Sequence, residues 1–112
     1  MRRNHKHNAV RTMCDGHVFP SKLEARVYAE LKLRERACEI FNLELQPVYV
    51  LLAGWTRNGK AVAPIKYIGD FRFVENGRIV VADAKGQETP VFRLKQKMFW
   101  ARYPDIELRV VK

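Results

Sequence analysis

The first regular pattern of apolar and polar positions predicts an α-helix over residues 21–37. Its apolar residues recur at helical spacing on one face: Leu23, Val27 and Leu31. Ser21 and Glu24 form an S-x-x-E capping box at the start of the helix, and Glu30 with Arg34 form an i,i+4 pair on another face. This segment therefore carries its own start signal as well as an apolar face.

A second helix is predicted from Thr89 to Tyr103. Thr89 and Pro90 are typical of an N-cap followed by an N1 proline, and Tyr103-Pro104 ends the pattern. The predicted apolar stripe consists of Val91, Leu94, Met98 and Ala101. Residues 106–111 then predict a strand. Because it follows a helical crossover, we expect it to lie parallel to the strand that precedes the helix.

Three runs rich in Val, Ile, Tyr and Phe predict strands over residues 47–53, 65–74 and 78–85. The first run ends at Gly54 and a polar stretch around Asn58-Gly59. Asn76-Gly77 separates the last two runs and is typical of a two-residue type I′ hairpin turn. The predicted fold class is α/β (α+β): helix, three antiparallel strands, helix and strand, with a mixed central sheet flanked by helices.

The Asn76-Gly77 turn fixes which residues face each other across the predicted hairpin. Glu75 pairs with Arg78, so Asp70 lies opposite Asp83. Directly opposed residues have Cβ atoms about 4.5–5.5 Å apart, where like charges are destabilising. A divalent cation resolves this conflict, because Mg²⁺ is commonly held by one or two carboxylates with water and substrate phosphate oxygens. Lys85 follows Asp83 by two residues and points to the same sheet face.

A purely structural interpretation of the same residues stays open. Lys85 can simply pair with Asp83 at the solvent-facing end of a strand. Glu24 can simply complete the capping box by accepting a hydrogen bond from the Ser21 backbone N–H. On its own, Glu24 does not identify a site.

The charge of the chain favours a polyanionic partner. The net charge is +9, and two acid-free stretches concentrate it. The first holds Arg2, Arg3, Lys6 and Arg11, and the second holds Arg93, Lys95, Lys97 and Arg102. Binding of such patches to phosphates releases counterions, so nucleic acid is the expected partner. A solvated basic surface is the alternative.

Other sequence features limit the compartment and the cofactors. The longest apolar run, residues 48–53, is too short to cross a bilayer, and the polar N-terminus lacks a signal-peptide core. We therefore expect a soluble cytoplasmic protein, with no membrane partner and no small-molecule cofactor. Cys14 and Cys38 are expected to be reduced thiols. His5, His7, Cys14 and His17 could form a zinc site, although their spacing matches no standard pattern.

The motifs together resemble the PD-(D/E)XK nuclease superfamily. They are Ser21-Lys22-Leu23-Glu24, Gly69-Asp70-Phe71 and Asp83-Ala84-Lys85-Gly86, with Gly69 at the nominal proline position. The likeness extends to small phage-encoded proteins, including Holliday-junction-resolving endonuclease I. It covers about residues 19–111 and implies a restriction-endonuclease-like αβββαβ core. We therefore expect a single nuclease domain over residues 1–112, with 1–18 as a basic arm or short hairpin and 19–112 as the core.

The resemblance implies the chemistry of the site. Glu24, Asp70 and Asp83 would bind Mg²⁺ or Mn²⁺, the Ala84 carbonyl is a further candidate ligand, and Lys85 would be the catalytic lysine. The expected function is a metal-dependent DNA endonuclease, selective for branched or Holliday-junction DNA, in phage DNA metabolism and DNA recombination. Since junction resolution needs two cuts, a homodimer is expected. The alternatives are a non-catalytic nucleic-acid-binding module and a transposition- or restriction-type nuclease.

Overall fold

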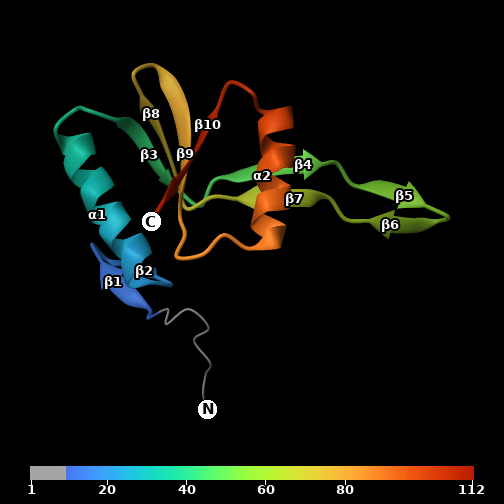
Figure 1. The fold of residues 1–112 in the computed structure, drawn as a ribbon, viewed down its shortest axis with the longest axis horizontal. Helices are drawn as coiled ribbons and strands as arrows, with labels where there is room; N and C mark the ends of the chain where they lie inside the picture. The colour runs from blue at the N-terminus through green and yellow to red at the C-terminus, as the bar shows by residue number, and fades with distance from the viewer. Residues whose placement is uncertain (1–9) are drawn as a thin grey trace, which may run out of the picture.

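The computed structural model describes residues 10–112, and a four-stranded mixed sheet forms its centre (Figure 1). The sheet order is β10-β9-β8-β3, with β10 parallel to β9 and the other neighbours antiparallel. The strands are β3 (Phe41–Leu45), β8 (Phe71–Glu75), β9 (Arg78–Ala84) and β10 (Glu107–Val111). The predicted mixed α+β class and the parallel last strand are confirmed.

One helix covers each face of this sheet. The α1 helix (Lys22–Arg36) packs Val27, Tyr28 and Leu31 against one set of strand residues, which includes Phe71 and Phe73. The α2 helix (Pro90–Arg102) packs against the opposite face, where the core contains Leu51, Tyr67, Val81, Phe92 and Phe99. Alternate residues of β9 therefore belong to different cores: Val80 and Ala82 to the α1 side, Val81 to the α2 side.

The Asn76-Gly77 turn and its register are as predicted. Both residues have positive φ, 52° and 76°, as a type I′ turn requires. The observed pairs run from Glu75 with Arg78 to Phe71 with Ala82. The regular pairing ends there. Asp70 directly precedes β8, and its backbone N–H donates to the Ala82 carbonyl at 3.2 Å, one residue out of this register.

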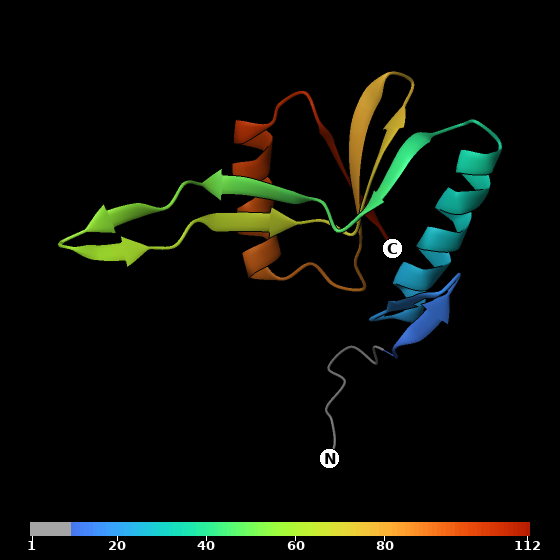
Figure 2. The same cartoon turned by 180° about the vertical axis from the view of Figure 1, so that it is seen from behind.

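A long two-stranded arm projects from the sheet past α2, away from α1 (Figure 2). Its base consists of β4 (Val48–Leu52) paired with β7 (Ile65–Ile68). Its end consists of β5 (Trp55–Arg57) paired with β6 (Lys60–Val62) around Asn58-Gly59, whose φ values are also positive. This second Asn-Gly hairpin lay in the stretch that the sequence analysis treated only as a polar strand end.

Two strand predictions were wrong because of this arm. The predicted first strand, residues 47–53, corresponds to β4 and belongs to the arm, and its place in the central sheet is taken by β3. The predicted strand over 65–74 divides at Gly69-Asp70 into β7 and β8, which pair in different sheets. The physical reason is a bend that both backbones make together at Gln46 and Asp70. Gln46 N–H donates to Asp70 O and Gly69 N–H donates to Pro47 O, so the two segments stay paired across the bend.

The N-terminal hairpin is confirmed with slightly shifted bounds. Thr12–Cys14 (β1) pairs with His17–Phe19 (β2) around Asp15 and Gly16, which both have positive φ. The hairpin packs beside the first turns of α1 (Figure 1). The Phe19 ring packs against the rings of Tyr28 and Phe71 in tilted geometry, so the hairpin belongs to the α1-side core.

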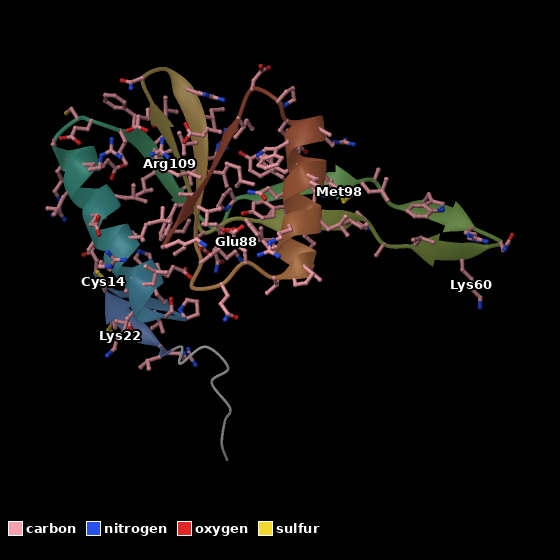
Figure 3. The ribbon with its side chains drawn as sticks, viewed as in Figure 1. Cys14, Lys22, Lys60, Glu88, Met98 and Arg109 are labelled. Atoms are coloured by element: carbon pink, nitrogen blue, oxygen red, sulfur yellow. The ribbon has the colours of Figure 1, made fainter. Side chains whose placement is uncertain are left out.

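Both predicted helix starts are confirmed. The Ser21 hydroxyl accepts from Glu24 N–H at 3.1 Å, and the Thr89 hydroxyl accepts from Phe92 N–H at the same distance. The predicted Glu30–Arg34 pair is wrong. Arg34 instead bonds Glu39 and Glu75, and the Glu75 partnership ties α1 to the end of β8. Arg109 of β10, labelled in Figure 3, also bonds Glu75, at 2.8 Å.

The predicted apolar stripe of α2 is wrong. Val91, Leu94 and Ala101 are exposed, whereas the buried residues are Phe92 and Phe99. The aromatic rings occupy the inner face because they fill the space between the sheet and the base of the arm, where Phe99 packs against Tyr49, Tyr67 and Tyr103. Met98, labelled in Figure 3, also packs against this core.

Within residues 10–112, no helix is both long and apolar enough to span a membrane. Cys14 and Cys38 are both free thiols, and Cys38 is exposed.

Gly69→Ala tests the bend that separates β7 from β8. A Cβ there would lie 2.6 Å from the fully buried Val81 side chain and 3.4 Å from Pro47. We expect a loss of about 1–3 kcal/mol in the free energy of unfolding, because overpacking moves buried groups. Gly86→Ala is the control, since nothing lies within 4 Å of its Cβ. Equal urea midpoints for the two variants would contradict the close packing of Gly69 at this bend.

Candidate active site

Asp70 and Asp83 lie side by side at the end of the β8–β9 pairing. Asp83 is on β9 and only 2% exposed, and Asp70 occupies the bend between β7 and β8. The Asp83 carboxylate is close enough to Asp70 to raise the pKa of Asp70 further above its ordinary value than burial alone does. Ala84 N–H donates to Asp70 Oδ2 at 2.8 Å, which fixes the Asp70 side chain against β9. The structure thus brings together the two acids that the turn register paired.

Glu24 reaches the same place from α1. It is 7% exposed, and its carboxyl group adjoins that of Asp70. The Glu24 backbone N–H donates to the Ser21 hydroxyl at the N-cap. Among the described residues, Ser21 N–H does not donate to the Glu24 carboxylate in return. The capping box therefore accounts for the Glu24 backbone and leaves its side chain at the carboxylate cluster.

Lys85 lies on the α2 side of the cluster. Its Nζ is 3.8 Å from Asp83 Oδ2 and 4.8 Å from the centre of the Phe92 ring. The ion pair with Asp83 is the one that the structural interpretation expected. Its stem and head group are held between a buried carboxylate and a buried aromatic ring, so the ammonium group is fixed at the edge of the cluster.

Tyr67 is a residue of the site that the sequence analysis missed. It lies on β7, is 4% exposed, and its hydroxyl donates to Asp83 Oδ2. In a single strand over 65–74, Tyr67 and Asp70 would point to opposite faces because they are three positions apart. The bend at Gly69-Asp70 removes that constraint, so both side chains reach Asp83.

Burial and repulsion between the carboxylates raise the pKa values of the titratable groups in the cluster. Burial, followed by the neighbouring Asp83 carboxylate, raises the pKa of Asp70 to about 8. Burial is also the main cause that raises the pKa of Glu24, with Asp83 adding to it and Lys85 opposing it. Burial and the Asp83 charge raise the pKa of the Tyr67 hydroxyl, which keeps it a proton donor. Without a further cation, the cluster therefore keeps a proton on Asp70 up to about pH 8.

The donor set fits a hard divalent cation bound by two carboxylates. Among residues 10–112, no group of three or more His, Cys, Asp and Glu side chains is arranged to hold a metal ion. Mg²⁺ does not need such a group, because it commonly takes one or two carboxylates and fills its other positions with water and phosphate oxygens. Asp70 and Asp83 supply that pair, and a cation between them would remove the repulsion that raises the pKa of Asp70.

A hollow adjoins the cluster on its Glu24 side. It has a volume of about 170 Å³ and lies between the N-terminal hairpin and the β3–β4 junction. Its polar lining residues are His17, Glu24, Gln46 and Asp70. Gln46 has positive φ, and its backbone N–H holds the Asp70 carbonyl. The hollow gives solvent-borne molecules access to two of the three carboxyl groups.

The remaining predicted residues are distributed over several surfaces. Ala84 lies beside Asp70 through its N–H, and Lys95 lines a hollow with Lys85. Arg93 and Lys97 are exposed on α2 and do not line that hollow, and Arg11 is exposed before β1. Arg2, Arg3, Lys6, His5 and His7 lie outside the residues described. Of the considered zinc ligands, the structure therefore describes only Cys14 and His17, which face each other across β1 and β2.

Comparison with known families gives one match. Residues 4–112 match the family described as "Protein of unknown function (DUF1064)". The chain belongs to the DUF1064 family. No curated protein and no solved structure matches it significantly. The DUF1064 match spans the central sheet, the arm and the carboxylate cluster, so the site lies within the family's sequence rather than in an appended segment.

The raised pKa of Asp70 predicts how the stability of this DUF1064 chain depends on pH without metal. The native state holds a proton on Asp70 up to about pH 8, whereas the ordinary value is 3.8. The native state therefore binds more protons than the unfolded state between these values, and its stability falls as the pH rises through them. We expect the melting temperature in EDTA to decrease from pH 5 to pH 9.

Asp70→Asn should remove most of this decrease, because an amide carries no charge at either pH. Asp105→Asn, which neutralises an exposed carboxylate, is the control and should retain the wild-type pH profile. Differential scanning fluorimetry over this pH range measures both. An Asp70→Asn profile as steep as that of the wild type would show that Asp70 is not the group that takes up the proton.

Proposed function

We propose that this DUF1064 chain is a metal-dependent endodeoxyribonuclease that hydrolyses phosphodiester bonds. One observation carries the proposal: two opposed carboxylates, Asp70 and Asp83, lie at the end of a buried hairpin with Lys85 beside them. Two like charges placed together at a largely buried position are costly unless a cation joins them. A soluble basic protein with such a pair has the charge to attract DNA and the ligands to hold Mg²⁺ beside it.

Each residue of the cluster has a distinct role in this proposal. Asp70 and Asp83 would hold the cation, with Glu24 and the Ala84 carbonyl as further candidate ligands. The bound Mg²⁺ or Mn²⁺ supplies an activated water and neutralises charge on the phosphate oxygens. Lys85 would stabilise the negative charge that develops on the scissile phosphate. Tyr67 holds one Asp83 oxygen and so leaves the other free to bind the cation.

The order of the central elements supports the proposed restriction-endonuclease-like core. Without the arm and the N-terminal hairpin, the chain runs α1, β3, β8, β9, α2 and β10, which is an αβββαβ order. The PD-(D/E)XK resemblance expects this order, with the acids at the start of the second strand and the end of the third. The chain therefore agrees with the resemblance in two separate respects: the order of its helices and strands, and the positions of its acidic residues.

The proposed substrate is branched DNA, of which a Holliday junction is one form, in phage DNA metabolism. This part of the proposal rests on the resemblance to junction-resolving endonucleases and on the net charge of +9. Two cuts in one junction require two active sites, so the proposed assembly is a homodimer acting in the cytoplasm of a bacterial or phage-infected cell. Transposition- and restriction-type nucleases share the same acids and differ only in substrate.

A non-catalytic nucleic-acid-binding module is the second candidate function. The Lys85–Asp83 ion pair favours it, since such a pair can be purely structural. This candidate predicts DNA binding that does not respond to divalent metal. The nuclease proposal predicts cleavage that requires it.

Asp70→Asn and Lys85→Ala separate these candidates. With Mg²⁺ and branched, linear and supercoiled DNA, we expect each variant to lose cleavage by about 100-fold or more, because each loses a group that acts in the transition state. Both should still bind DNA in a gel-shift assay, since the other basic residues are intact. EDTA should abolish cleavage by the wild type.

Asp105→Asn and Lys97→Ala are the matched controls, because both residues are exposed and lie outside the carboxylate cluster. They should cut DNA at nearly the wild-type rate. Cleavage by Asp70→Asn at the wild-type rate would reject the site assignment. If the wild type does not cut any of these DNA forms with Mg²⁺ or Mn²⁺, the binding-module function is favoured instead.

A further inference from the structure

A second hollow adjoins the carboxylate cluster on the side opposite Glu24. It has a volume of about 250 Å³ and is lined by three lysines from three different segments: Lys66 of β7, Lys85 after β9 and Lys95 of α2. Tyr67, Phe92 and Thr89 are among its other lining residues. Because Lys85 and Tyr67 both also contact Asp83, this hollow and the carboxylate cluster are continuous.

The lysines of this hollow lack enough negative partners. No Asp or Glu lines it. Lys85 is paired with Asp83, but within residues 10–112 neither Lys66 nor Lys95 takes part in an ion pair. Residues 1–9 contain no Asp or Glu, so their side chains cannot supply the missing charge. The hollow therefore concentrates positive charge that a bound anion would neutralise.

The floor of the hollow is rigid. Tyr67 and Phe92 are 4% and 5% exposed, and their rings pack together in the α2-side core. Lys85 Nζ is held over the Phe92 ring. The three lysines start from a strand, a strand end and a helix that all pack on this core, so the backbone holds them around the hollow without a change of fold. The hollow also lies at the N-terminal end of α2, where the helix dipole favours an anion.

The basic residues of α2 do not contribute equally to it. Successive residues of an α-helix are separated by about 100°, so Lys97 points about 160° away from Lys95. Lys95 is half-buried at the hollow, whereas Lys97 and Arg93 are exposed and do not line it. This arrangement separates Lys95 from the two other basic residues that the sequence grouped with it, and it adds Lys66, which the sequence did not single out.

We propose that this hollow, defined by Lys66, Lys85 and Lys95, binds a phosphate of the DNA backbone next to the phosphate that is cut. The inference rests on the proposed nuclease function for the position of the cut and deepens it by naming a second contact on the same strand. The Glu24-side hollow has acidic and neutral polar lining residues and no lysine. The neighbouring phosphate therefore lies on the α2 side of the carboxylates.

Salt-dependent binding tests the charge contribution. Binding of a fluorescent DNA duplex to the full-length chain is measured in EDTA at several salt concentrations. Each phosphate contact contributes about 0.9 to the slope of log affinity against log salt, and the hollow is proposed to hold one phosphate, so Lys66→Ala with Lys95→Ala should reduce the slope by about 0.9. Lys60→Ala removes an exposed lysine at the far end of the arm, outside both basic stretches; it is the control and should leave the slope unchanged. A wild-type slope in the double variant would overturn the proposal.

Neutral methylphosphonate linkages, placed one at a time, locate the contact. In the wild type, one linkage next to the cut site should weaken binding, and in the Lys66→Ala, Lys95→Ala variant the same linkage should have no effect. The Lys97→Ala protein should respond like the wild type. An unchanged effect of that linkage in the double variant, at an unchanged melting temperature, would overturn the assignment.

Cleavage of the same duplex by the wild type with Mg²⁺ is measured in parallel to separate the two proposals. Cleavage together with an unaltered salt slope in the double variant rejects the phosphate hollow and leaves the nuclease function standing. A reduced slope without any cleavage supports the hollow as a phosphate site and rejects the nuclease function.

Discussion

The pairing of β8 with β9 is the constraint on which the site depends. Asn76 and Gly77 adopt positive φ, and this two-residue turn leaves a single register for the strands that leave it. In that register Asp70 and Asp83 meet at the far end of the hairpin, where burial and their mutual repulsion raise the pKa of Asp70. A shift of one residue would turn both Asp83 and Lys85 to the α1 side and separate them from Tyr67 and Asp70.

The two helices and the arm supply the residues of the site that do not come from the β8–β9 hairpin. The α1 helix brings Glu24 to Asp70, and the aromatic core under α2 positions Tyr67 against Asp83 and Phe92 under Lys85. As a result, the carboxylates lie between two hollows of different character, one lined by Glu24 and Gln46 and one lined by lysines. Under the proposed function, this asymmetry would give a bound DNA strand a preferred side, and neither helix alone could supply it.

The local signals predicted the carboxylate cluster better than the sheet around it. Turn residues, caps and strand register act over a few positions, so the hairpin, both helix starts and the Asp70–Asp83 pair could be deduced. Tyr67, β3 and the arm could not, because they depend on a bend that the two paired backbones make at Gln46, Pro47 and Gly69 and that no periodicity reveals. The buried face of α2 was also missed, since the packing of Phe99 with Tyr49 and Tyr103 decides it.

The central claim is that Asp70 and Asp83 hold a divalent cation between them. Titration of the metal-free protein with Mn²⁺, followed by electron paramagnetic resonance of the free ion, tests it without DNA and without turnover. We expect one specific Mn²⁺ site in the wild type and in Asp105→Asn, and we expect Asp70→Asn to lose it. Equal Mn²⁺ binding by wild type and Asp70→Asn, or no specific site in the wild type, would contradict it.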